Sequence, residues 1–382
     1  MNAPAEVMAL EAVSTETISP EEISLEAGRV VSYRLFDVGD EILLAAARAR
    51  LAGEGIAVSE VRVGGFSHEV ALDLAEVGGP LEVEELGSLQ VSARLFAQGM
   101  ISVRFELAAP PGPLADTGPL LRRCGEHPRL AEEGRRVVER LRPQLGPTLV
   151  PGPVWEGVED YTALLVTSLG GGLQASALRQ RLPLVSRLLL GERGDARVAA
   201  AEVEELSRHQ DSYLDDDLVV IHWDTALVVE PSGSREVLGV LEFACAVLTG
   251  LRNYDAHLDQ EVTRFYEEAR RRRRPLLGGF ARQARLVQQR WLELTEFTER
   301  FENAIKVMDD HYYARVYRRA LERFRVPDWQ RSVDRKQGRL AQVYSYLKSE
   351  ADTQRATLLE VSIVLLILVE IVLFALEKLG RL

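Results

Sequence analysis

The stretch LLEVSIVLLILVEIVLFALEKLGRL, residues 358–382, contains the most apolar part of the chain. Sixteen of the nineteen residues from Leu358 to Leu376 are Leu, Ile, Val, Phe or Ala. At about 1.5 Å per residue, a helix of this length suits a hydrocarbon core roughly 30 Å thick. The sequence therefore predicts one C-terminal transmembrane helix at 358–376 and a short tail at 377–382. Residues expected inside the bilayer include Leu358, Ile363, Leu366, Glu370 and Phe374.

Glu370 lies near the middle of this predicted span. A central acid costs about 2.5 to 3.5 kcal/mol of insertion free energy, and each aliphatic residue contributes about −0.3 to −0.6 kcal/mol. The fifteen large apolar residues therefore outweigh Glu370. Three hypotheses remain open for its carboxyl group. It stays protonated, it meets Glu370 of neighbouring copies in a homo-oligomer, or a ring of these side chains lines an aqueous path.

Charge is distributed unevenly along the 382 residues. The net charge is −12, but residues 264–346 hold twenty Lys and Arg against eleven Asp and Glu. Such a basic window is typical of a surface for anionic lipid or nucleic acid, and also of a long solvated helix with mixed charges. Arg270, Arg271, Arg272, Arg273 and Arg274 are the residues expected to contact lipid or RNA.

Compartment is indicated by the cysteines and by the N-terminus. Cys124 and Cys245 show no motif spacing, so we expect reduced thiols in the cytosol. The first 22 residues are acidic and lack the basic and apolar regions of a secretory signal. We therefore expect a tail-anchored, single-pass membrane protein whose N-terminal bulk stays in the cytoplasm.

Apolar alternation and turn residues predict an α+β head made of two modules. Residues 1–27 are expected to form a flexible acidic tail before it. The first module, 28–150, is expected to hold strands at 29–36, 60–66, 91–99 and 100–107 and helices at 39–52 and 128–145. The second, 151–233, is expected to hold a strand at 160–169, helices at 179–191 and 199–208, and a strand pair within 217–231.

The pattern from residue 234 to 357 is helical and predicts a stalk. Two sets of residues alternate by four and three, as in the heptads of a coiled coil. They are Val287, Trp291, Leu294, Thr298, Phe301, Ile305 and Met308, and then Val333, Gln337, Leu340, Tyr344, Leu347, Ala351, Gln354 and Leu358. With a short helix at 312–325 between them, the simplest arrangement is an antiparallel helical stalk that continues into the span.

A polar cluster lies on the first helix of this stalk. It consists of Arg252, Tyr254, Asp255 and Asp259, in which the charged residues are three and four apart and share one helix face. One interpretation is an Arg and Asp pairing that docks the helix on the head, with Tyr254 in the interface. The other is a polar pocket for a small ligand or an RNA phosphate.

Several blocks in the helical half resemble the Required for Meiotic nuclear Division family, whose shared region is a domain of unknown function. They include VLEFACAVLTGLRNYDAHLDQEVTRFYEE, the run from NAIKVMDDHYY to QVYSYL, and LLEVSIVLLILVEIVL. Arg252, Tyr254 and Asp255 match a family run in which Gly250 and Asn253 depart from the usual residues. The resemblance implies a membrane-anchored protein and, from the mitochondrial member, support of translation at a membrane.

Known catalytic and cofactor motifs were not found. The chain has no P-loop, dinucleotide fingerprint or Gly-x-Ser-x-Gly elbow, and its six histidines show no metal-ligand spacing. We therefore expect no cofactor or metal and a non-enzymatic scaffold or tether that holds a macromolecular partner, such as the translation machinery, near the bilayer. The alternatives are a membrane-surface enzyme acting on a nucleotide or lipid-linked substrate, and an oligomeric channel.

Overall fold

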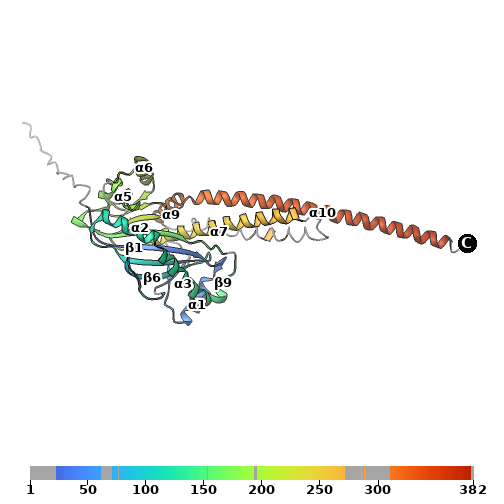
Figure 1. Cartoon of the computed structure of the whole chain (residues 1–382), viewed down its shortest axis with the longest axis horizontal. Coiled ribbons are helices and arrows are strands. Elements are labelled where there is room, and N and C mark those ends of the chain that lie inside the picture. Colours follow the sequence, from blue (N-terminus) through green and yellow to red (C-terminus); the bar gives the residue numbers. More distant parts are fainter. Residues whose placement is uncertain are drawn as a thin grey trace, which may run out of the picture.

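The computed structural model describes residues 23–61, 71–75, 77–152, 154–192, 196–271, 285, 288, 289, 292 and 310–379. Strands and short helices form a head, and long helices project from one end of it (Figure 1). The predicted tail at 1–27 lies outside the described residues up to residue 22, and a strand already begins at Ser24. The first predicted heptad seam, from Val287 to Met308, also lies outside them.

One large mixed sheet forms the centre of the head. Its main path has the order β11-β12-β13-β10-β1-β7-β6-β4-β3, with β5 paired to β6 and β8 paired to β1. The strands are β1 (Ser24–Asp37), β3 (Val58–Val61), β4 (Ala71–Leu74), β5 (Leu81–Val83), β6 (Gly87–Phe96), β7 (Met100–Ala108), β8 (Gly112–Pro113), β10 (Glu159–Leu169), β11 (Gln210–Asp211), β12 (Leu218–Ile221) and β13 (Thr225–Val229). β2 (Glu41–Ile42) and β9 (Leu149–Val150) form a separate pair.

β1 joins the two ranges that the sequence suggested as separate modules. It pairs antiparallel with β7 along one edge and with β10 along the other, so that Val31 lies between Glu106 and Ala163. Apart from the β2–β9 pair, the described strands of 28–150 and of 151–233 therefore belong to one continuous sheet. The proposed boundary near residue 150 remains a prediction, because a shared sheet neither places nor excludes a boundary in the chain.

Alternate residues of the central strands face two different cores. Val30 and Leu164 belong to the core on one face of the sheet, and Val31 and Leu165 to the core on the other. This is the period of two that a strand imposes on its side chains. Because both faces are covered, the part of β1 from Val30 to Asp37 is a continuous buried run rather than a polar and apolar alternation.

Helices from residues 44–208 cover the first face of the sheet, and the helices that follow residue 235 cover the second (Figure 1). The first set is α1 (Leu44–Gly53), α2 (Gly118–Glu126), α3 (Pro128–Leu145), α4 (Ala175–Arg179), α5 (Leu182–Leu189) and α6 (Ala200–Arg208), with 3-10 turns η1 (Leu114–Thr117), η2 (Gly146–Thr148) and η3 (Gly170–Gly172). The second set is α7 (Glu236–Arg271), α9 (His311–Arg323) and the first turns of α10 (Val326–Leu379).

Many of the expected elements are confirmed. α3 matches the predicted helix at 128–145, and Gly99 makes the tight turn between β6 and β7 with a φ of 75°. A Cβ on Gly99 would lie 1.8 Å from the Gly39 carbonyl oxygen, so only glycine fits there. The helix expected at 179–191 is found as α5, which begins three residues later, because Arg181 is not helical and Pro183 lies in the first turn of α5; the preceding helix α4 ends at Arg179.

α7 and α10 run in the same direction away from the head (Figure 1). Asp255 of α7 accepts a hydrogen bond from Ser332 of α10, 77 residues later, at 2.8 Å. One turn further along, Lys336 lies 2.6 Å from Asp259. This parallel pair differs from the antiparallel pair proposed for 287–308 and 333–358, which the described residues do not test.

Candidate functional site

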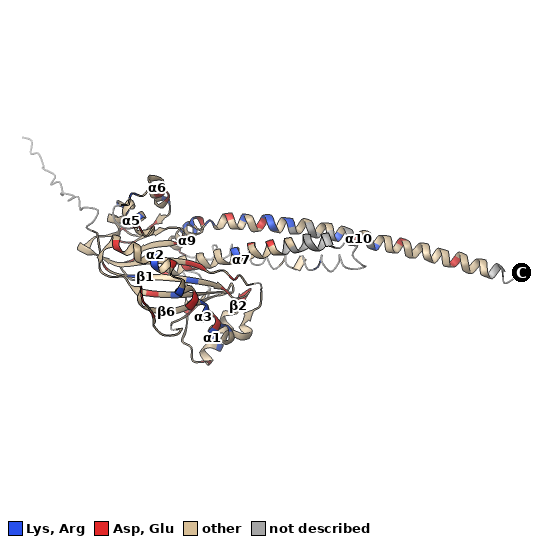
Figure 2. Ribbon diagram, viewed as in Figure 1, with Lys and Arg blue, Asp and Glu red and all other residues tan. Residues whose placement is uncertain are grey.

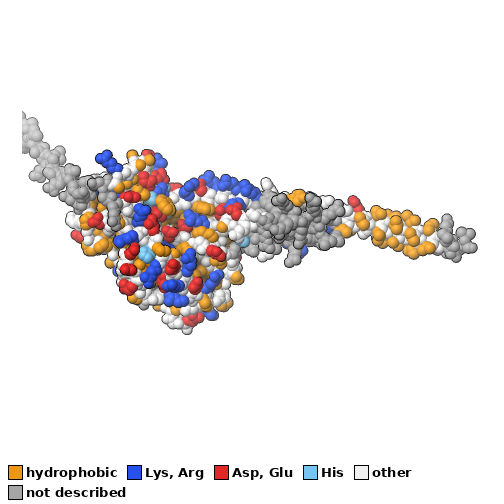
Figure 3. Space-filling model, viewed as in Figure 1, with side chains coloured by type: hydrophobic (Ala, Val, Ile, Leu, Met, Phe, Trp, Pro, Cys, Tyr) orange, Lys and Arg blue, Asp and Glu red, His pale blue; other side chains and the backbone are white. Residues whose placement is uncertain are grey.

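The outer part of α10 is an apolar helix whose side chains are exposed in the described part of the chain. From Arg355 to Leu376, 22 residues, the helix is long and apolar enough to cross a membrane, and none of this segment is buried. Leu366 is 67% exposed and Phe374 65%. Figure 3 shows this end of the molecule as a band of apolar side chains. In contrast, the apolar segment Glu236–Gln260 passes the same length test but is 94% buried against the sheet.

Polar side chains within the apolar segment are few. Ser362 donates its hydroxyl to the Leu359 carbonyl at 2.8 Å, which satisfies it within the helix. Glu360 and Glu370 are exposed, and within the described residues neither makes an ion pair. In a bilayer the Glu370 carboxyl would need a proton, water or a partner. Its role in self-association remains a prediction.

The predicted polar cluster lies where α7, α10 and the sheet meet. Lys336 of α10 lies 2.8 Å from Asp255 and 2.6 Å from Asp259, so one ammonium group joins two acids of α7. Arg252 points the other way and pairs with Glu159 on β10, while its guanidinium lies 5.3 Å from the centre of the Trp329 ring. The cluster therefore connects three elements.

Burial changes the pKa of one acid at this contact between α7 and the sheet. The pKa of Glu159 is raised to about 7 because the carboxyl is desolvated, although Arg252 opposes the shift. The Tyr254 side chain is buried at 7% exposure in the core beneath α7. These contacts dock α7 on the head. Arg252 pairs with β10, and the two aspartates pair with α10, so Arg252 does not pair with an aspartate of its own helix.

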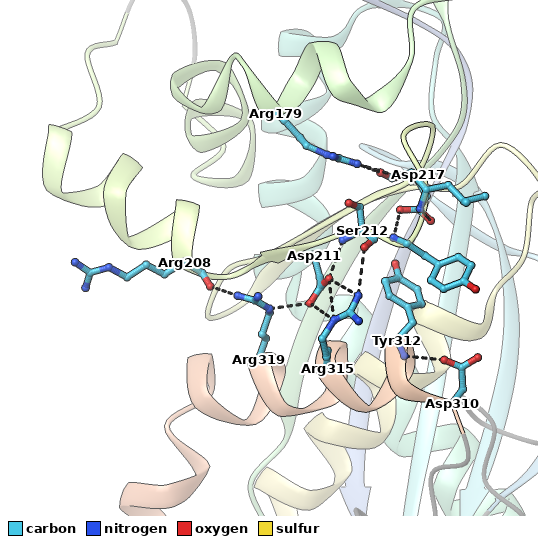
Figure 4. Close-up of polar contacts among 11 residues, drawn as sticks. Arg179, Arg208, Asp211, Ser212, Asp217, Asp310, Tyr312, Arg315 and Arg319 are labelled. Carbon is cyan, nitrogen blue, oxygen red and sulfur yellow. Dashed lines mark hydrogen bonds and ion pairs between the residues drawn. The ribbon is translucent and has the colours of Figure 1, made fainter.

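A second joint, which the sequence reasoning missed, attaches α9 to the edge of the sheet. Asp211 on β11 accepts from Arg319 at 2.9 Å and from Arg315 at 3.1 Å (Figure 4). Burial alone would raise the pKa of Asp211, but the two arginines outweigh it and hold that pKa below its usual value. Arg323 continues the row, 3.3 Å from Glu202 and 3.2 Å from Glu205.

The sequence carried a signal for this joint. Arg315, Arg319 and Arg323 are spaced by four, which places them on one face of a helix. The acid at Asp310 caps the same helix by accepting from the Tyr312 backbone N–H at 2.7 Å. Asp310 is therefore the N-cap residue of α9.

Exposed arginines form a basic face on α9 and the start of α10. We call it the arginine face, and its residues are Arg318, Arg325, Arg331, Arg335 and Arg339. Figures 2 and 3 show Lys and Arg gathered along the helices next to the head. Arg325 and Arg331 share Asp328, whereas the described residues provide no acid for Arg335 or Arg339.

The arginine run at 270–274 begins at the end of α7. Only Arg270 and Arg271 belong to the described helix, and 272–274 lie outside the described residues. The offset of 77 between α7 and α10 sets Arg270 level with residue 347. At about 1.5 Å per residue, Arg270 therefore lies about 16 Å before Leu358 along the helix axis, on the head side of the predicted span.

The head corresponds to a known sequence family. A family model described as the N-terminal domain of uncharacterized protein MJ0711 matches residues 27–235, which is more than half of the chain. The chain belongs to the MJ0711 N-terminal domain family. The matched range begins within β1 and ends one residue before α7. The MJ0711 N-terminal domain is thus the sheet with its short helices, and α7, α9 and α10 follow it.

One curated relative matches about half of the chain. Uncharacterized protein MJ0711 of Methanocaldococcus jannaschii is 26% identical over 202 residues, which cover 52% of this chain and 61% of the relative. The chain thus spans less than two thirds of that relative's length. No solved structure matches the chain. These similarities do not confirm the resemblance to the Required for Meiotic nuclear Division family, which therefore remains a prediction.

Proposed function

We propose that this protein is a tail-anchored, single-pass membrane scaffold that holds a macromolecular partner near the bilayer as a homo-oligomer. The head and the arginine face lie on the cytoplasmic side in this proposal, and α10 anchors them. The observation that carries it is the wholly exposed apolar segment Arg355–Leu376. Such a surface on a soluble protein would be a strong aggregation liability, and a bilayer removes it from water.

The distance between the arginine face and the bilayer suits a tether. Arg339 precedes Leu358 by nineteen residues of continuous helix, which is about 28 Å at the helical rise. That distance exceeds the Debye length of about 8 Å at physiological salt, so the face would act on a partner rather than on the lipid surface. The basic face favours a partner with an acidic or phosphate-bearing surface.

The translation machinery is the first partner to test, because the Required for Meiotic nuclear Division resemblance implies it. The full-length protein would be purified in mild detergent, and the proteins and RNA that purify with it would be identified. Arg335→Gln with Arg339→Gln should reduce ribosomal RNA recovery by about tenfold, whereas Arg136→Gln, on α3 across the sheet, should not. Equal recovery with all variants would exclude the arginine face as the surface that binds the partner. Absence of any co-purifying partner would reject the tether function.

Lipid contact by Arg270 to Arg274 is a separate part of this proposal. We would replace all five by Gln in a chain that ends before Arg355 and measure its binding to anionic vesicles. Each arginine near the surface contributes on the order of 1 kcal/mol, so binding at low salt should fall by at least tenfold. Unchanged binding would reject the lipid role of these arginines.

A further inference from the structure

A polar cavity of about 560 Å³ lies between the first turns of α7 and the sheet. Strands β1, β3, β4, β6 and β7 line one side, and residues from Ser234 to Glu242 line the other. The volume is within the range of small-molecule sites in proteins. It lies on the face opposite α3 and apart from the joints that hold α9 and α10.

The cavity contains charged side chains that the fold has removed from water. Arg94 is 5% exposed, Glu106 6% and Glu242 1%. Side chains alternate between the two faces of β6 and β7. Ala93 and Phe105 face the opposite core, so their neighbours Arg94, Arg104 and Glu106 face the cavity. Glu242 has a different origin, since it is an acid on the otherwise apolar buried face of α7.

Most of these charges satisfy one another. Asp73 accepts from Arg94 at 2.6 Å and 2.9 Å and lies 3.1 Å from Arg104. Arg235 pairs with Glu106 at the rim. All three arginines of the cavity thus already have a carboxylate partner, which leaves little positive charge for an anionic ligand.

Glu242 is only partly satisfied by the other charged groups of the cavity. Its Oε2 lies 2.7 Å from Nη1 of Arg94, but its Oε1 accepts no hydrogen bond from the described residues. Four acids and three arginines line the cavity, so its ionised groups carry one net negative charge. A buried carboxylate oxygen without a donor is costly, and a ligand N–H would satisfy it. Burial also raises the pKa of Tyr33, which keeps the phenol of this cavity wall neutral.

The geometry points to a binding site for a small organic cation, one that places a primary ammonium or guanidinium group against Oε1 of Glu242. The positive group would form a charge-assisted hydrogen bond in a site shielded from water. The remaining wall, with Ser59, Gln90 and Ser92, would accept or donate hydrogen bonds to the rest of the molecule. The alternative that this protein is an enzyme also requires a pocket with clustered ionisable groups. Binding of a small ligand is common to that alternative and to the cation site proposed here.

Calorimetric titration of the full-length protein in detergent tests the site. The probes are agmatine and spermidine as cations, butylurea as a neutral analogue and glutarate as an anion. We expect the cations alone to bind at concentrations below about 1 mM. Failure of both cations to bind, or equal binding of butylurea, would overturn the inference.

Variants connect that binding to this cavity. Glu242→Gln keeps the size of the side chain and should weaken cation binding at least about tenfold, whereas Glu132→Gln, an exposed acid on α3, should leave it unchanged. Ser59→Trp places a large ring at the exposed edge of the cavity, opposite Asp73 on the paired strand β4, and should also abolish binding. If Glu242→Gln fails to fold, Ser59→Trp decides, and wild-type affinity in that variant would place the cation elsewhere.

Discussion

Two acids placed at the centre of the apolar segment 358–376 should make its free energy of membrane insertion unfavourable. Fifteen large apolar residues contribute roughly −4.5 to −9 kcal/mol, and after the cost of Glu370 the net insertion free energy is roughly −1 to −6 kcal/mol. Leu366→Asp replaces a favourable contribution by an unfavourable one, a change of about 3 to 4 kcal/mol. Leu366→Asp with Ile367→Asp therefore shifts the balance by about 6 to 8 kcal/mol, enough to prevent insertion.

The assay is alkaline extraction of membranes that contain the full-length protein. Wild type and the matched apolar variant Leu366→Ile should remain in the pellet, whereas the double aspartate variant should appear in the supernatant. Because Leu366 and Ile367 are 67% and 50% exposed, the thermal midpoint of the head should stay unchanged. A double variant that remains in the membrane would refute the insertion argument. A large loss of head stability would instead show that this segment packs against the protein.

Three further predictions concern individual carboxyl groups. Glu370→Leu should shift crosslinked protein toward monomer, and an unchanged oligomer distribution would remove the self-association role. Asp211→Asn weakens the joint with Arg315, so hydrogen exchange in α9 should increase and the free energy of unfolding should fall by about 1–2 kcal/mol; wild-type exchange would contradict this. Burial raises the pKa of Asp37 to about 7, so its ionisation opposes folding and stability should decline from pH 4 to pH 7. Asp37→Asn mimics the protonated acid and should be more stable at pH 8 by on the order of 2–4 kcal/mol, with equal stability near pH 4.

Local patterns predicted the elements better than their partners. The helix at 128–145 and the apolar end of α10 each depend on neighbouring residues, and the structure confirms both elements. The pairing of β1 with β10 joins Val31 to Ala163, which is too distant in the chain for any local pattern to specify. Sequence reasoning therefore separated strands that belong to one sheet.

The cavity was missed for a related reason. Glu242 occurs within the run VLEFACAV, where a single acid is easily taken for a residue on the solvent side of a helix. Its burial becomes evident only when β6 and β7 place Arg94 and the Arg104–Asp73 pair beneath α7. Similarly, the spacing of Arg315 and Arg319 on α9 was readable, but their common partner Asp211 lies over a hundred residues earlier.

The length of α10 connects the two halves of the proposal. It is a single helix of 54 residues, about 81 Å long at the helical rise, and its one proline, Pro327, lies in the first turn, where it does not interrupt the helix. Lys336 fixes the base of α10 to α7, and α7 is itself buried against the sheet. A bilayer around residues 358–376 would therefore determine how far the head stands from its surface. No proline follows Lys336 in α10, so helix geometry alone would set the distance between the arginine face and the bilayer. Inserting a Gly-Pro pair after Arg339 should abolish this fixed distance, and it should leave both the head and the anchor intact.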